Sequence, residues 1–161
     1  MRRRTRVITQ PDGLFYEMSR VFVSESTGAA VYVHSHDHCS PHVHAQHRRD
    51  AWVARVAFSY VDSEVELKDI APTNRPPPRR ILNAVVSDVQ GHLADCRRTW
   101  WTVQQTTGLA NRWAIVPAPG VIELLPMQKS YAKQIADARY DPASQRLLVI
   151  FRDGSRVETR I

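Results

Sequence analysis

Short apolar and β-branched runs, separated by turn-forming residues, fill the first half of the chain. In residues 64–68 polar and apolar side chains alternate, which is typical of a strand with one face in the core and one in water. Thr27-Gly28 and Pro41 interrupt the earlier runs, as residues at turns between strands do. The pattern predicts a small antiparallel sheet. Its expected strands are residues 18–24, 30–36, 42–47, 53–61 and 64–68.

A proline-rich connector, APTNRPPPRR at residues 71–80, ends this strand pattern, because consecutive prolines exclude both regular helix and ladder pairing. Apolar residues then recur every three or four positions, as on one face of an amphipathic helix. We expect one long helix covering the sheet, with a kink or close packing at Gly91 and a C-terminal stop at Gly108. The apolar positions are Ile81, Val85, Val89, Leu93, Cys96, Trp100 and Val103.

The last third of the chain returns to a strand pattern after an irregular segment. Residues 113–126 contain three prolines and a glycine among apolar residues, and they predict a packed linker without regular structure. Asp153-Gly154 is a strong hairpin signal, because the turn it forms needs positive φ. The expected strands of this tail are residues 137–140, 146–152 and 156–160.

These elements predict an α+β fold, in which a small antiparallel sheet is covered by one long helix and followed by a small β-rich C-terminal unit. The expected domains are a histidine-rich sheet-and-helix domain at residues 1–108, an irregular linker at 109–134 and a β-hairpin appendage at 135–161.

Composition adds a charge preference to this picture. The chain has 22 Lys and Arg residues against 16 Asp and Glu residues, a formal net charge of +6, which favours nucleic acid or an acidic partner protein. The arginines at positions 2–4, with Arg79 and Arg80, are expected polyanion contacts. No apolar run approaches the roughly 20 residues that span a bilayer, and the N-terminal arginines precede no signal-peptide segment. We therefore expect a cytoplasmic protein without membrane association, and a homo-oligomer is left open.

Six of the seven histidines lie within residues 33–49, VHSHDHCSPHVHAQHRR. Side chains alternate across a strand, so histidines two positions apart share a face. If the strands on either side of Pro41 pair, four imidazoles meet on one face of the sheet. The expected cluster holds His34, His36, His42 and His44, with Asp37, His38 and Cys39 at its rim.

Such a cluster suits metal binding in one interpretation. Neutral imidazoles and a cysteine thiolate are ligands for zinc or nickel. We expect no cofactor, and the metal centre is kept as the alternative. Its ligands would be His36, His42, His44 and Cys39.

Proton transfer without a metal is a second interpretation. His42 or His44 would act as general acid or base while Arg48 or Arg49 holds a phosphate, as in a metal-independent ribonuclease. A hydrated sheet face whose histidines have no function is the third alternative. No Walker loop, GxSxG elbow or CxxC pair points to another chemistry.

The histidine segment also resembles a prokaryotic family, domain of unknown function 4160. The likeness covers residues 21–103 and rests on a hydrophobic strand, an Asp-His pair and then Pro-His-x-His. The chain departs from the family pattern at Ser40, in the extra histidines His34 and His36, and in the proline-rich connector. The motif residues are Asp37, His38, Pro41, His42 and His44.

The tail resembles a second family, domain of unknown function 2442, through IADARY at residues 135–140 and LLVIFRDG at 147–154. Members of the two families often occur as neighbours or fusions, in compact gene pairs like those of toxin–antitoxin modules. The resemblance therefore implies a toxin–antitoxin-like binding module that engages nucleic acid or a partner protein, and it assigns no activity. The expected phosphate-binding residues are Arg48, Arg49, Arg79 and Arg80.

Overall fold

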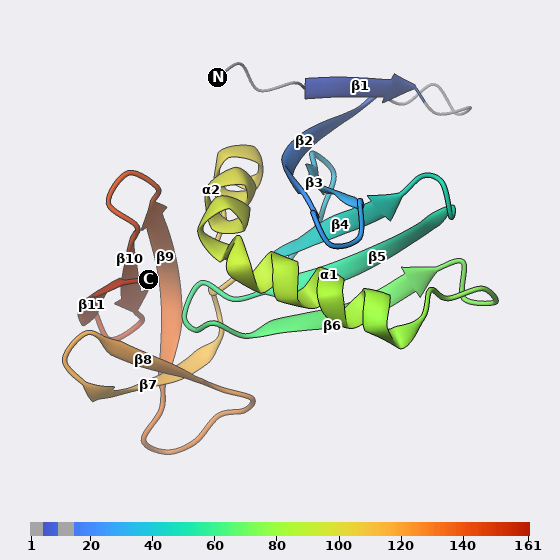
Figure 1. The fold of residues 1–161 in the computed structure, drawn as a ribbon. Coiled ribbons are helices and arrows are strands. Elements are labelled where there is room, and N and C mark those ends of the chain that lie inside the picture. The colour runs from blue at the N-terminus through green and yellow to red at the C-terminus, as the bar shows by residue number, and fades with distance from the viewer. Residues whose placement is uncertain (1–4, 10–14) are drawn as a thin grey trace. The chain divides into compact units, whose positions relative to one another are not determined.

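The computed structural model of the chain describes residues 5–9 and 15–161, with side chains from Met18 onward. The arginines at positions 2–4 lie outside the described residues. The chain forms two compact units (Figure 1). Unit 1 holds Met1–Ser59 and Ser63–Gln104, and unit 2 holds Tyr60–Asp62 and Gln105–Ile161.

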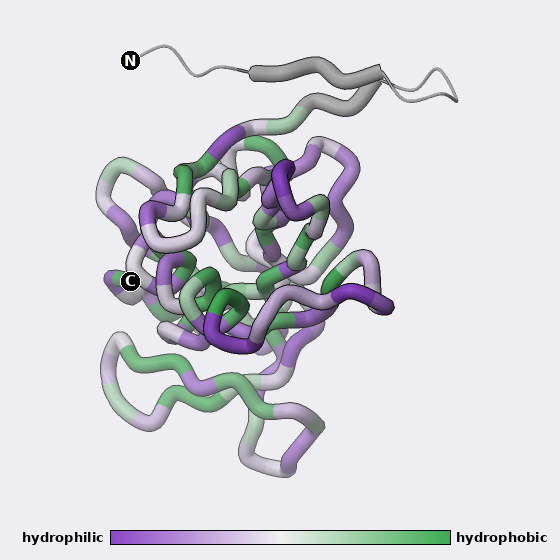
Figure 2. The backbone as a smooth tube through the Cα atoms, turned by 45° about the vertical axis from the view of Figure 1, so that its right-hand side comes forward, coloured by the Kyte–Doolittle hydropathy of each residue, from purple (hydrophilic) through white to green (hydrophobic). Residues whose placement is uncertain are grey.

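Unit 1 contains a six-stranded antiparallel sheet whose strands follow one another in chain order. Along its fifth strand every second side chain is buried, and Figure 2 shows hydrophobic and hydrophilic stretches alternating along the backbone. The predicted strands of the first half are confirmed, with ends that differ by a few residues. The strands are β1 (Thr5–Thr9), β2 (Phe15–Val23), β3 (Ala30–His34), β4 (His42–His47), β5 (Trp52–Phe58) and β6 (Val65–Ala71).

Two helices, α1 (Arg79–Gly91) and α2 (Leu93–Gln104), follow the proline-rich connector. α1 contacts β5 and β6, and α2 contacts β2, β3 and β4. The apolar face expected from the sequence is largely buried. No helix of the described chain is long and apolar enough to cross a bilayer. The buried members of that face are Val85, Val89, Leu93, Cys96 and Trp100.

The prediction of one long helix was wrong, because the helix ends at Gly91 and a new one begins at Leu93. The N–H of His92 donates to the carbonyls of Asp88 and Val89, and His92 Nδ1 lies 2.9 Å from the Asp88 carbonyl. The His92 ring also stacks on Phe22 of β2 at 4.0 Å between centroids. These contacts satisfy the end of α1 and hold the break in place.

Unit 2 contains a five-stranded antiparallel sheet in the order β11-β10-β9-β7-β8. Its core side chains are aliphatic and aromatic, and the ring of Tyr60 lies 5.1 Å from that of Tyr140. The predicted strands of the tail are confirmed, and Gly154 has the positive φ (83°) expected at a hairpin turn. The strands are β7 (Trp113–Ala118), β8 (Val121–Leu125), β9 (Lys133–Asp141), β10 (Arg146–Phe151) and β11 (Arg156–Arg160).

The expected irregular linker at residues 109–134 was wrong, because it contains the paired strands β7 and β8. Proline removes a ladder donor and is tolerated at irregularities and turns. Pro117 falls where the β7–β8 register shifts, between Ile115 and Ala118, and Pro119 precedes Gly120, whose φ is 72°. Two of the three prolines that suggested irregular structure therefore occupy the bulge and turn of a hairpin, and the third, Pro126, directly follows β8.

Candidate functional site

The connection between β3 and β4 holds a carboxylate in a fixed position. Asp37 Oδ2 accepts the backbone N–H of His34 at 2.9 Å, and the Asp37 N–H donates to the His34 carbonyl at 3.2 Å. That carbonyl also accepts from Nε2 of Gln104, the last residue of α2, at 2.7 Å. The turn is thus held by hydrogen bonds between His34 and Asp37 and by one from Gln104 of α2, and Asp37 faces the start of β4.

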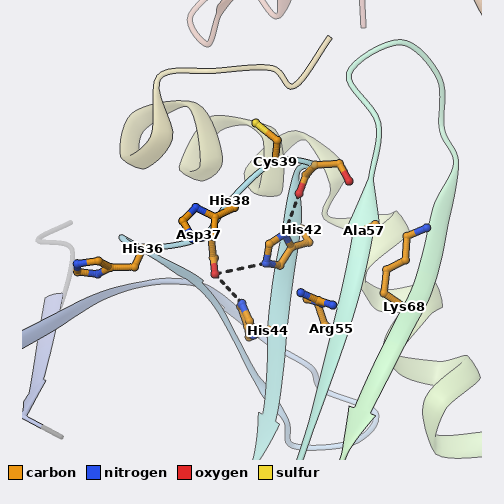
Figure 3. Close-up of a pocket in the computed structure, with 10 residues that line it drawn as sticks. His36, Asp37, His38, Cys39, His42, His44, Arg55, Ala57 and Lys68 are labelled. Carbon is orange, nitrogen blue, oxygen red and sulfur yellow. Dashed lines mark hydrogen bonds and ion pairs between the residues drawn. The ribbon is translucent and has the colours of Figure 1, made fainter. Parts of the chain in front are cut away.

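Asp37 joins two imidazoles through one oxygen. Its Oδ1 lies 2.9 Å from His44 Nε2 and 3.3 Å from His42 Nε2 (Figure 3). His42 and His44 are two positions apart on β4 and share a face of the sheet, as strand alternation predicts. Burial acts to raise the pKa of Asp37, but the hydrogen bonds from His42 and His44 outweigh it and hold this pKa well below its ordinary value.

His42 lies between two oxygen acceptors. Its Nδ1 is 2.8 Å from the Ser40 carbonyl, while Nε2 faces Asp37. Only the protonated imidazole has an N–H for each acceptor. Burial acts to lower the pKa of His42, but the Asp37 carboxylate and the Ser40 carbonyl outweigh it, so the pKa is raised. Both pKa shifts therefore favour the ionised pair of an Asp37 carboxylate and a His42 imidazolium.

His34 completes the cluster as a neutral ring. It stacks on His44 with centroids 4.0 Å apart and planes 4° apart, and its Nε2 is buried without a hydrogen-bond partner. Burial, followed by the electrostatic interaction with His44, lowers the pKa of His34 to about 4. Three of the four expected imidazoles thus converge. His36 is exposed and points away from Asp37 (Figure 3), and its Nδ1 lies 3.0 Å from Ser35 Oγ.

The cluster partly meets the requirements of a metal centre. The ligand atoms of His34, Asp37 and His44 lie within 4.8 Å of one another, a set that does not include His42. An imidazole binds a metal in its own ring plane, and the stacked, nearly parallel rings of His34 and His44 share no such position. Of the expected ligands, His36 and Cys39 are exposed. Zinc or nickel would require a ring to turn, and metal binding stays a prediction.

A pocket of about 290 Å³ opens beside the cluster. Arg55 lines it from β5, directly opposite His44 in the strand register, and Lys68 lines it from β6 (Figure 3). Arg55 pairs with Asp69, and Lys68 Nζ lies 2.5 Å from Glu66. Sequence reasoning missed both cations, because only the register of β4, β5 and β6 brings them next to the histidines.

A second charged feature lies at the other end of β4. The turn between β4 and β5, the proline-rich connector and the start of α1 meet there, since all three line a separate pocket of about 290 Å³ (Figure 1). We call the exposed arginines of these segments the basic end. Among the described residues none of them makes an ion pair. The basic end consists of Arg48, Arg49, Arg75, Arg79 and Arg80.

The expected phosphate-binding arginines therefore lie on segments that meet at this end of β4, although some 30 positions separate Arg49 from Arg79 in the chain. Arg48 and Arg49 do not lie beside His42 and His44 as the ribonuclease interpretation supposed, because β4 runs between them. The nearby acidic side chain of Asp50 pairs with His47, at 3.2 Å from its Nδ1.

Fold and site define a two-unit α+β protein with a histidine–aspartate cluster and a basic end on the same unit. No family model, no curated protein and no solved structure matches the chain. The likeness to the two families of unknown function stays a prediction.

Proposed function

We propose that the protein is a binding module that engages nucleic acid through its basic end. The observation that carries this proposal is that five exposed arginines, without ion pairs among the described residues, lie on three chain segments that meet at one pocket. Guanidinium groups bind phosphate oxygens through paired hydrogen bonds, and each contact releases counterions from the nucleic acid. A free set of arginines is therefore suited to a phosphate backbone.

The start of α1 supports the same proposal. Arg79 and Arg80 occupy its first turn, where the helix dipole disfavours cations. This turn has no acidic residue, and Pro78 at the N-cap offers no side-chain hydrogen bond. Uncapped N–H groups at a helix N-terminus bind phosphate readily, and two flanking arginines add to that preference. A bound phosphate would satisfy both the N–H groups and the arginines.

Other basic side chains are less available to a polyanion. Arg55, Arg98 and Arg146 pair with acidic neighbours, at 2.9 Å for Arg98–Asp95 and 2.7 Å for Arg146–Glu158. A polyanion would have to displace these carboxylates. A role of toxin–antitoxin type, which the family resemblance implies, would use the basic end for nucleic acid or for an acidic partner protein.

Binding of a fluorescein-labelled single-stranded RNA, followed by anisotropy between about 50 and 200 mM salt, tests the proposal. Each lost phosphate contact lowers the slope of log affinity against log salt by about 0.7 for a single strand. The double variants R48A/R49A and R79A/R80A should each weaken binding and lower that slope by about 1.4. The matched control R156A/R160A removes two exposed arginines from β11 and should bind like the parent protein.

Two results would overturn the proposal. One is the absence of RNA and DNA binding at about 50 mM salt. The other is an equal loss of affinity in the control, which would show a response to net charge alone. Binding of poly-glutamate without binding of nucleic acid would instead assign the basic end to an acidic partner protein.

A further inference from the structure

We propose that Asp37 and His44 form a general-base pair that cleaves RNA bound at the basic end. This inference rests on the proposed function, and it adds a reaction, a substrate class and distinct roles for the clustered histidines.

The tautomer of His44 carries the argument. Its Nε2 lies 2.9 Å from Asp37 Oδ1, and since a carboxylate only accepts, Nε2 is the nitrogen that holds the proton. Nδ1 is then left with a lone pair, and no described residue hydrogen-bonds to it. The side chain is 17% exposed and lines the pocket. A carboxylate that fixes one imidazole nitrogen and leaves the other free is the arrangement that general bases use.

The contacts of the neighbouring histidines give them other roles and leave His44 as the general base. His42 has both nitrogens facing acceptors, so it is a positioning residue whose contact with Asp37 favours the ionised carboxylate. His34 stacks flat on His44 and holds the orientation of its ring. This assignment differs from the sequence-based hypothesis, in which His42 and His44 were equivalent candidates.

The surroundings of His44 suit a phosphodiester. Arg55 and Lys68 line the same pocket, and a phosphate bound there would take the place of their carboxylate partners Asp69 and Glu66. β4 connects this pocket to the basic end, and Arg48 lies four positions after His44, about 13 Å at the rise of a strand. One bound RNA strand can therefore contact both places, since single-strand binding sites cover several nucleotides.

The reaction is an internal transfer of the phosphodiester. His44 Nδ1 takes the proton of a ribose 2′-hydroxyl, and the 2′-oxygen forms a bond to phosphorus. The bond from phosphorus to the 5′-oxygen of the next nucleotide breaks, and that oxygen takes a proton from water. His44 then releases its proton to the hydroxide that remains. The products are a 2′,3′-cyclic phosphate and a 5′-hydroxyl, and no metal takes part.

The test uses the full-length protein with EDTA and a labelled RNA under single-turnover conditions, with mass spectrometry of the ends. The parent protein should produce the 2′,3′-cyclic phosphate. His44→Gln should lower the cleavage rate by at least about 100-fold, the usual contribution of a general base, without changing RNA affinity. Asp37→Asn should lower the rate with affinity likewise unchanged, which a merely unfolded variant would not show. The variant R156A/R160A, whose arginines lie on β11 and do not line this pocket, is the control and should cleave normally.

The outcomes separate this inference from the proposed function. RNA binding without cleavage overturns the inference and leaves the proposed function standing, whereas failure of both overturns both. Cleavage that persists in His44→Gln, that requires added zinc, or that also cuts a strand lacking the 2′-hydroxyl overturns the inference. The melting temperature of each variant shows whether its fold is retained.

Discussion

At the scale of single residues, His34 makes one contact that stabilises the fold and has one polar atom whose burial destabilises it. Its ring stacks on His44, while its buried Nε2 has no hydrogen-bond partner. An unsatisfied buried polar atom costs about 1–3 kcal/mol of stability. Because burial lowers the pKa of His34 to about 4, below the unfolded value of 6.5, the folded protein resists its protonation. The stability from a neutral His34 is present above pH 6.5 and is lost as the pH falls toward 4.

Replacing His34 by phenylalanine keeps the stacked ring and removes both the unpaired nitrogen and the titration. We expect His34→Phe to raise the free energy of unfolding by about 1 kcal/mol at pH 7. The advantage over the parent protein should grow between pH 6.5 and 4, where the parent loses stability. Urea denaturation of both proteins at pH 7 and pH 5 measures this difference. A variant less stable than the parent at pH 7 would show that Nε2 has a partner.

The sequence predicted those features of this site that depend on local strand geometry alone. Strand alternation placed His42 and His44 on one face and included His34, and all three converge. It could not identify Asp37 as the centre of the cluster, because the turn that aims its carboxylate depends on Gln104. The expected four-imidazole face also included His36, which the end of β3 at His34 leaves in the loop.

At the scale of elements, the break between α1 and α2 shows what periodicity leaves out. The spacing of apolar residues continues through Gly91, so the pattern alone predicts one helix. The interruption depends on His92 and its stacking on Phe22, a contact with a residue 70 positions earlier in the chain. Similarly, prolines can indicate an irregular segment or the bulge of a hairpin, and pairing with β8 decides between them.

Gly91 itself is expected to be replaceable. A Cβ at this position would meet no atom within 4 Å, so Gly91→Ala should stabilise the protein by about 0.5–1 kcal/mol through the lower entropy of the unfolded chain. Thermal denaturation measures the change. Gly154→Ala is the contrasting variant and should destabilise, because Gly154 has a φ of 83°. A destabilised Gly91→Ala would mean that the glycine, rather than His92, permits the break.

At the scale of the whole molecule, the boundary between the units does not follow the chain. Tyr60–Asp62, between β5 and β6, belongs to unit 2 together with the residues that follow Gln104. Tyr60 is fully buried there, with its ring 5.1 Å from that of Tyr140. Sequence patterns predicted the strands of unit 1 from β2 onward and three of the five strands of unit 2, but gave no sign of this assignment, which depends on a long-range aromatic contact.

Truncation of Tyr60 should therefore weaken unit 2. We expect Tyr60→Ala to cost about 3–5 kcal/mol, as for other large buried aromatic residues, by lost burial and a cavity. Amide hydrogen exchange should accelerate in β9 and β10. Tyr131→Ala, which removes a tyrosine that is 67% exposed, is the control and should change stability by less than about 0.5 kcal/mol. Unchanged exchange in β9 and β10 of Tyr60→Ala would contradict the assignment of this tyrosine to unit 2.

The same three residues limit how this protein can be taken apart or recombined. A gene segment that begins at the codon for Gln105 encodes most of unit 2 but omits the tyrosine that fills its core. Transfer of that segment to another protein would give a domain with a cavity in its core, unless a loop of the recipient supplied an aromatic side chain. Recombination at the junction after Gln104 is therefore disfavoured, and unit 2 would be inherited together with the loop between β5 and β6.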